Sequence, residues 1–278
     1  MASAVAPTIS PSSISLPPVV QEFEKKYEEE KNETSYFKEL AHWIQTTLGI
    51  KRACKFVANG VKWPQNYAKE LNLDPKVVKT LFNVETGVKS FSKKLIIMKY
   101  PSSISNLNDC YNDYMKADKK NSTRKMDKLA KQVFDFISDS ATLIQLGELF
   151  GLYVLGTVIG AANILAANFF HLLYHTMNLK IGSEDYKEHN QMYNQIENPA
   201  KLSNRIKTIF NETKNLDNIK LTKTITAIAL SCIMITELSL GLVLLPATMI
   251  LLFATVANVF SIWAHFYEKS MTYQPVSK

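Results

Sequence analysis

The chain contains 278 residues, of which 46 % are hydrophobic, and it carries a formal net charge of +7 at pH 7. This size allows one large or two modest domains, and three widely separated cysteines argue against a disulfide framework or a zinc ribbon. The first residues lack the basic region and the long apolar core of a signal peptide, so we expect internal segments to direct any membrane insertion.

The positive charge is concentrated in one block. Residues 1–50 sum to −3, residues 51–100 to +8 and the remaining residues to +2. A basic block can bind an anionic membrane, nucleic acid or an acidic partner. Arg52 is its only arginine, the residue type suited to bidentate contacts with guanine, so the block favours anionic lipid headgroups over nucleic acid.

The N-terminal part of the chain is predicted to consist of a tail followed by helices. Residues 1–33, first rich in Pro and Ser and then in Glu and Lys, are predicted to form a disordered, charged tail. Residues 34–123 are predicted to be a basic amphipathic helical region on the membrane surface. It begins with a helix over about 34–48 and continues with a helix over 51–63, for which Pro64 is the expected stop.

The most regular pattern lies between Pro75 and Tyr100, with Asp74 as a natural N-cap and Pro101 as the expected stop. Seven apolar residues line one face at alternating spacings of four and three: Val77, Leu81, Val84, Val88, Phe91, Leu95 and Met98. Six lysines accompany them: Lys76, Lys79, Lys89, Lys93, Lys94 and Lys99. This composition is typical of a helix that lies in a membrane surface with its lysines toward anionic headgroups. The same stripe can pack on neighbouring helices, and the two roles are compatible.

Residues 124–180 are predicted to form an amphipathic helix that leads into a first membrane segment. Residues 149–179 contain no Asp, Glu, Lys or Arg, which is long for one perpendicular helix. We therefore expect tilt, or a break at Gly156 or Gly160. Residues 181–223 are predicted to be a polar connector that holds one short helix around 202–210.

The last apolar stretch, residues 224–267, has Glu237 as its only formal charge. Roughly 20 apolar residues cross a bilayer as a helix, so this length predicts a transmembrane helical hairpin that turns near Gly241 or Pro246. Residues 268–278 form a short tail. The predicted fold class is all-α, a helical integral membrane protein with amphipathic N-terminal helices, and a soluble bundle with two buried core helices is the alternative.

The two apolar stretches share a pattern at an offset of ninety residues. Residues 167–170 (Ala-Asn-Phe-Phe) align with residues 257–260 (Ala-Asn-Val-Phe). Glu148 matches Glu237 one residue out of step. The alignment indicates a duplicated helix–break–helix unit.

Few residue patterns in the chain suggest chemistry. His171 and His175 share a helix face at the spacing of a two-histidine metal site, but a third ligand would have to come from His265, so we predict no metal and no other cofactor. Phosphate-binding glycine loops and Ser-His-Asp signatures are not evident, and we do not expect an enzyme. Glu148 and Glu237 are candidate intramembrane acids, and a small-solute carrier or channel that uses them is an alternative function.

The order of elements supports a family resemblance. The segments that carry it are Lys51-Arg52-Ala53-Cys54-Lys55, Gly60-Val61-Lys62-Trp63, a basic amphipathic helix ending in Lys93-Lys94-Leu95, and the C-terminal apolar hairpin. Over about residues 40–265 the chain resembles the peroxin-eleven family of peroxisomal membrane-elongation proteins. The resemblance implies that the helix over about 75–100 wedges into the cytosolic leaflet, promotes curvature and tubulation, and self-associates. The charged first forty residues and the more apolar second half depart from that family, and the long paired apolar lobes also resemble the inclusion-membrane proteins secreted by chlamydial bacteria.

The predicted function is that of an integral membrane protein that shapes or scaffolds its membrane, as in organelle elongation or fission. The expected partners are anionic lipid headgroups and further copies of the chain. A peroxisomal membrane is the expected location, and a host-derived inclusion membrane is the alternative. A membrane-anchored adaptor that recruits a protein partner through the acidic first fifty residues is the other alternative function.

Overall fold

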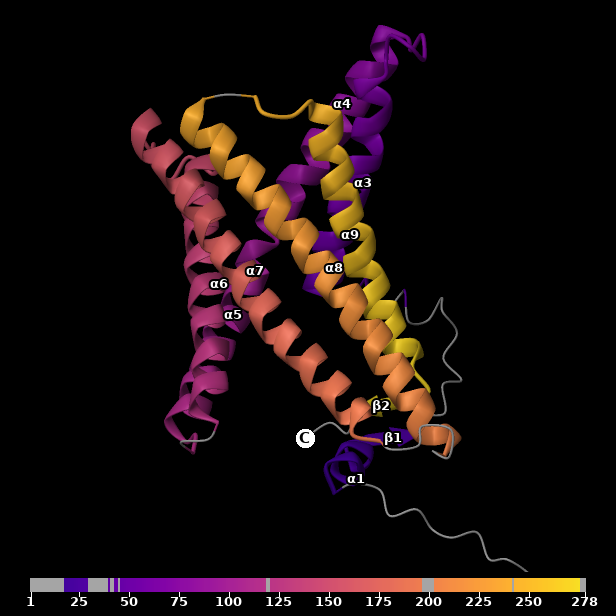
Figure 1. Cartoon of the computed structure of the whole chain (residues 1–278). Helices are drawn as coiled ribbons and strands as arrows, with labels where there is room; N and C mark the ends of the chain where they lie inside the picture. The colour runs from indigo at the N-terminus through magenta and orange to yellow at the C-terminus, as the bar shows by residue number, and fades with distance from the viewer. Residues whose placement is uncertain are drawn as a thin grey trace, which may run out of the picture.

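A computed structural model describes residues 18–29, 40, 43–44, 46–118, 121–196, 203–241 and 243–275. The described part is almost entirely helical, which confirms the all-α class (Figure 1). Its helices are α1 (Pro18–Lys25), α3 (Thr47–Asn66), α4 (Pro75–Lys94), α5 (Ile96–Met115), α6 (Ser122–Leu149), α7 (Thr157–Asn194), α8 (Asn204–Leu240) and α9 (Ala247–Ser270). Two short strands, β1 (Tyr27–Glu29) and β2 (Tyr273–Pro275), pair antiparallel.

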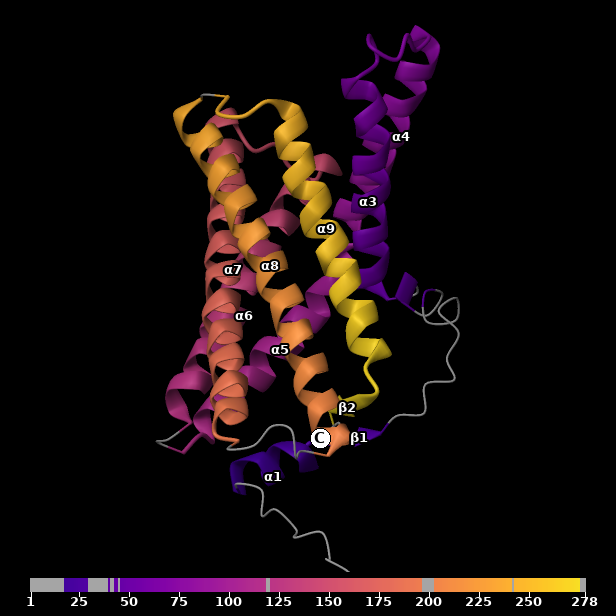
Figure 2. The same ribbon diagram turned by 45° about the vertical axis from the view of Figure 1, so that its right-hand side comes forward.

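Six of the helices close into a ring. From α5 to α9 each helix packs against the next one in the chain, as antiparallel neighbours joined by short connections do. Helix α9 then packs against α3, and α3 touches α5, which completes the ring. Helix α4 lies outside the ring against α3 (Figure 2).

Two prolines expected to end helices lie inside them. Helix α3 runs through Pro64, and α5 runs through Pro101. The break expected at Pro101 falls instead at Leu95, between α4 and α5. A proline removes one helical hydrogen bond, but contacts with α6 hold α5: Tyr100 stacks on Phe136, and Ser103 donates a 2.7 Å hydrogen bond to Asp139. Tertiary packing therefore outweighs the local signal.

The first apolar stretch breaks at one of the two predicted glycines. Helix α6 ends at Leu149, and Gly156 is the N-cap residue of α7. Between them Gly151 adopts a φ of 71°, which a glycine tolerates without strain. Helix α7 then continues into the predicted connector as far as Asn194, and α8 already begins at Asn204. The polar connector over 181–223 is thus wrong as a separate segment, because most of it extends the two apolar helices.

These polar extensions form a small core with the N-terminal segment. Val20 and Phe23 of α1 are buried, as is Tyr27 of β1. They pack with Met192, Ile196, Ile206, Ile209, Phe210, Leu216 and Met271. A tail over 1–33 is therefore wrong for residues 18–29, whose apolar residues at spacings of three and four give α1 a face to bury. Residues 1–17 and most of the helix expected over 34–48 lie outside the described residues.

The C-terminal apolar stretch forms the predicted hairpin. Gly241 ends α8 in the left-handed region with a φ of 62°, and Pro246 is the N-cap residue of α9. Helices α7, α8 and α9 are each long and apolar enough to cross a membrane. Only 0 %, 17 % and 11 % of their most apolar windows is buried by the rest of the described chain. Lipid rather than protein would cover the remaining apolar surface, which disfavours the soluble bundle.

Candidate functional site

The predicted apolar stripe of α4 is divided between two roles. Its residues seven apart, Val77, Val84 and Phe91, are all exposed, Phe91 to 51 %. Met98, now in α5, is exposed as well. The intervening members lie deeper: Leu81 and Val88 are half-buried and Leu95 is buried. The stripe therefore consists of an exposed row of apolar residues, which we call the outer row, and a second row that is half-buried or buried.

A polar pair lies on the packed side of α4. Glu85 is buried and forms an ion pair with Lys89 one turn away. Burial alone would raise the pKa of Glu85, but Lys89, with Gln65 and Lys62 of α3, lowers it below its ordinary value. The Glu85 carboxylate therefore helps to fasten α4 to α3, a role that the spacing of apolar residues did not indicate.

The lysines of the predicted surface helix do not all face outward. Lys76, Lys79, Lys89, Lys93 and Lys94 are exposed and can meet headgroups. Lys99 instead lies 3.0 Å from an oxygen of Asp135 and 2.7 Å from one of Asp139, both on α6. Burial alone would lower the pKa of Lys99, but these two carboxylates raise it. Lys99 thus connects α5 to α6 and does not serve as a headgroup contact.

The direction of α4 is set by its contact with α3. Helix α3 packs on α9 through a hydrogen bond of 3.2 Å from Arg52 to the Ser261 carbonyl and one of 3.4 Å from Trp63 to Thr255. Helix α4 runs beside α3, so it follows the long axis of the bundle and does not cross it (Figures 1 and 2). In this arrangement the outer row of α4 faces sideways from the bundle that contains α9.

The two candidate intramembrane acids occupy equivalent places in two turns. An oxygen of Glu148 accepts a 3.1 Å hydrogen bond from the backbone N–H of Leu155, seven residues onward. An oxygen of Glu237 accepts a 3.1 Å bond from the N–H of Leu244, also seven residues onward, and a second from Leu245. Both glutamates thus stabilise the chain reversal between two helices. This geometry matches the duplicated unit expected from the sequence and assigns the acids a structural role.

Both turns are apolar and lie at the same end of the ring. Helix α7 runs antiparallel to its neighbours, so α6 and α8 end together, at the top of Figures 1 and 2. Val154 in the first turn is 89 % exposed and Val243 in the second is 85 % exposed. The polar extensions of α7 and α8 lie at the opposite end with α1. The two turns therefore lie at one end and the polar extensions at the other, while the charged connection between α3 and α4 lies at the same end as the turns (Figures 1 and 2).

The histidine pair lacks the third ligand that a metal site would need. The Nε2 atoms of His171 and His175 lie 3.0 Å apart on α7. His265 lies near the rings of Trp43 and Phe266, and no group of three metal-binding side chains is found among the described residues. The pair is accounted for as a hydrogen-bonded contact on one helix face.

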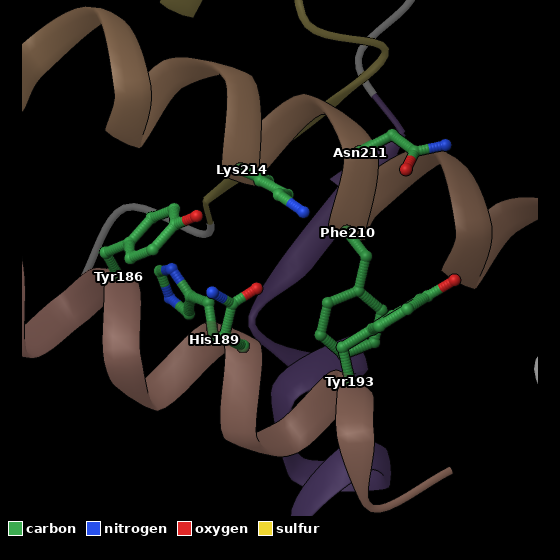
Figure 3. Close-up of a pocket in the computed structure, with 7 residues that line it drawn as sticks. Tyr186, His189, Tyr193, Phe210, Asn211 and Lys214 are labelled. Carbon is green, nitrogen blue, oxygen red and sulfur yellow. The ribbon is translucent and has the colours of Figure 1, made fainter. Parts of the chain in front are cut away.

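A small pocket that the sequence did not indicate lies between the polar extensions of α7 and α8 (Figure 3). Its volume is about 90 Å³, and it is lined by Tyr186, His189, Asn190, Tyr193, Phe210, Asn211 and Lys214. The His189 Nδ1 atom lies 2.7 Å from an Asp217 oxygen, which orients the imidazole. The aromatic residues of α7 recur at helical spacing, a signal that could have predicted a common face but not a pocket.

A second basic group, also missed, lies on α3. Burial lowers the pKa of Lys51 and of Arg52 on α3. It lowers the pKa of Lys55 to about 8, with further contributions from neighbouring cations. The basic block of the sequence is thus divided between two helices with different surroundings. The Arg/Lys run at residues 51–55 was visible in the sequence, but the contact of Arg52 with the Ser261 carbonyl of α9 was not.

Comparison with protein-family models, with curated proteins and with solved structures finds no match for this chain. The fold and the candidate surfaces define its class: a helical protein with three helices able to cross a membrane, as an integral membrane protein has.

Proposed function

We propose that this chain is an integral membrane protein that shapes or scaffolds its bilayer. The observation that carries the proposal is the pair of consecutive hairpins, α6–α7 and α8–α9, whose exposed apolar turns lie at one end while polar extensions lie at the other. Such hairpins enter a membrane turn first from one side, because their turns carry apolar side chains and their glutamates satisfy the turn backbone.

The division into apolar and polar ends favours curvature. The polar ends of α7 and α8, together with α1 and the strand pair, stay on the side from which the hairpins enter. The protein then occupies more area in and beside one leaflet than in the other, and a bilayer responds to such asymmetry by bending. The outer row of α4, with lysines at both ends of the helix, adds apolar contact with the same membrane.

The particular membrane follows from the family resemblance. Elongation of the peroxisomal membrane by a self-associating protein is the proposal that the peroxin-eleven resemblance supports, and a host-derived inclusion membrane is the alternative. The carrier alternative loses its motivation, because Glu148 and Glu237 accept hydrogen bonds from the backbone of their turns.

The test uses the full-length protein in vesicles of phosphatidylcholine with a minor fraction of phosphatidylserine, examined by electron microscopy. We expect the wild-type protein to convert round vesicles into tubules. The double variant V84E/F91E places two charges in the outer row of α4 and should reduce tubulation several-fold. The matched control N83E/T86E adds the same charge at exposed polar positions of α4 and should retain it.

Two results would contradict the proposal. Vesicles that stay round at all protein densities would remove the membrane-shaping function. Equal loss in V84E/F91E and N83E/T86E would mean that net charge, and not the apolar row, is what matters on α4.

A further inference from the structure

The small pocket between the polar parts of α7 and α8 has walls that the fold holds in place (Figure 3). Phe210 in its lining is buried and stacks on Phe23 of α1, with ring centres 4.8 Å apart. The ring of His189 lies 5.4 Å from the same Phe23 ring, and Tyr193 meets Phe210 edge-on at 5.5 Å. Helix α1 therefore supports two walls of the pocket, which is formed before any ligand arrives.

The imidazole of His189 is fixed in one orientation. Its Nδ1 atom lies 2.7 Å from an oxygen of Asp217. An ionised carboxylate only accepts hydrogen bonds, so Nδ1 carries the proton in this contact, and Nε2 is the ring nitrogen that remains for a ligand. The charge of Asp217 is thus engaged by His189 and is not directed at the pocket.

Lys214 supplies a positive charge to the pocket. Figure 3 shows its amine directed from α8 toward Tyr186 of α7. Within the described part of the chain Lys214 forms no ion pair. Two acids that neighbour the lining residues along α7 do have a partner, because Arg124 of α6 forms ion pairs with Asp185 and Glu188. The pocket therefore has one positive charge that no described acid neutralises.

The lining is polar on one side and apolar on the other. Lys214 and Tyr186 lie toward one side, and the rings of Phe210 and Tyr193 lie toward the other (Figure 3). The amide of Asn190 and the hydroxyl of Tyr186 add hydrogen-bond donors to the ammonium. This arrangement suits a ligand with an anionic group at one end and an apolar group at the other.

The volume and the charge of the pocket restrict the ligand further. A cavity of roughly 150 Å³ holds benzene, so a volume of about 90 Å³ admits a ligand of about four or five non-hydrogen atoms. One unpaired lysine balances one negative charge. A phosphate group carries about −1.5 to −2 charges near neutral pH, which Lys214 alone does not balance. The pocket therefore favours a singly charged carboxylate.

We propose that this pocket binds a small monocarboxylate of the size of acetate or propionate. The carboxylate accepts charge-assisted hydrogen bonds from the Lys214 ammonium, with the Tyr186 hydroxyl as a further donor. The short alkyl group lies against the rings of Phe210 and Tyr193. The inference does not depend on the membrane-shaping proposal, because the pocket lies in the polar extensions of α7 and α8.

The test measures binding of propionate to the full-length protein in a neutral detergent by saturation-transfer difference NMR, with protein-free micelles as the blank. We expect a dissociation constant on the order of 1 mM for so small a ligand. Propionamide has the same shape without the charge and should bind about tenfold more weakly or less. The variant K214M should weaken propionate binding by about tenfold or more, because it removes the charged hydrogen-bond donor. The control K187M removes an exposed lysine of α7 outside the lining and should leave binding unchanged.

Each outcome decides the proposal. Propionate binding that K214M loses, K187M keeps and propionamide does not reproduce supports it. If K214M does not fold, the comparison of propionate with propionamide on the wild-type protein decides alone. A propionate signal no larger than that of protein-free micelles overturns it, as does equal binding of propionate and propionamide or equal loss in K214M and K187M. Displacement of propionate by phosphate as readily as by acetate would overturn the assignment to a carboxylate.

Discussion

Lys55 shows how lysines of one basic block come to differ. Lys55 on α3 is exposed, as are Lys79 and Lys93 on α4. The pKa of Lys55 is nevertheless lowered to about 8 by the protein around it and by neighbouring cations. Helix α3 packs on α9 as well as on α4, whereas α4 packs mainly on α3.

The lowered pKa of Lys55, about 8 against an ordinary 10.5, predicts a specific pH dependence. Below pH 8 the lysine is charged in both the folded and the unfolded chain, and the unfavourable surroundings of this charge destabilise the fold in full. Between pH 8 and 10.5 the folded chain has released the proton and the unfolded chain still holds it, so this destabilisation fades and stability rises with pH. K55M should therefore be more stable than wild type at pH 7 and should gain less from pH 8 to 10. Melting curves across this range, with K79M as control, measure it. An identical pH profile for K55M and wild type would show that Lys55 is ordinarily solvated.

At the scale of elements, the repeated unit is a helix, an apolar turn with a left-handed glycine, and a second helix. Gly151 and Gly241 both have positive φ, and Glu148 and Glu237 each accept a backbone N–H from seven residues onward. A glutamate lies near the end of each first helix, where its carboxylate accepts a hydrogen bond from a backbone N–H of the turn. In an apolar environment that N–H would otherwise have no partner. This explains how two acids can lie beside membrane segments without a transport role.

Removing either carboxylate should therefore lower the stability of the fold without abolishing a transport activity. We expect E148A and E237A each to lower the free energy of unfolding by about 1.5–3 kcal/mol, the range for a hydrogen bond to a charged group. Denaturant titration in detergent measures it, and S239A, an exposed position next to the second turn, should change it by less than about 0.5 kcal/mol. Wild-type stability in both glutamate variants, combined with loss of a solute flux in vesicles, would restore the carrier alternative.

At the scale of the whole molecule, the ring has two chemically different ends. The apolar turns lie at one end, and the small core built from α1, β1, β2 and the polar parts of α7 and α8 lies at the other. The apolar helices leave most of their surface uncovered by protein. If the turns enter the bilayer first, as we propose, the end that contains α1 stays out of lipid, where each unsatisfied polar group would cost several kcal/mol.

The two turns should therefore behave alike in a membrane. In a background where the three native cysteines are serines, we expect K187C on α7 and N215C on α8 to react with a membrane-impermeant maleimide from the same side of reconstituted vesicles. L152C and V243C, one in each turn, should behave like each other and unlike K187C and N215C. Both should be protected from the maleimide, or both should react with it only from the far side. Turns that label from opposite sides would contradict the arrangement of the ring and the tip-first insertion that the proposed function requires.

Some features of the fold could be predicted from the sequence, and others could not. The break at Gly156, the turn between Gly241 and Pro246 and the pairing of Glu148 with Glu237 followed from apolar length, turn residues and repetition, all of which are local signals. Pro64 and Pro101 misled the helix boundaries because contacts with other helices outweighed the loss of one hydrogen bond at each proline. The ends of α7 and α8 were missed because the few apolar residues in these polar segments pack on α1, a contact between segments more than 150 residues apart.

The sequence by itself determined that the chain is helical, that three segments are apolar enough to cross a membrane, and that one fifty-residue block is basic. These properties are sums over neighbouring residues, and each can be counted along the chain. Only the tertiary structure decided that Lys99 binds two aspartates, that Arg52 contacts α9, and that both turns lie at one end. Those outcomes depend on how the helices close into a ring, and ring closure joins α3 to α9 across some two hundred residues.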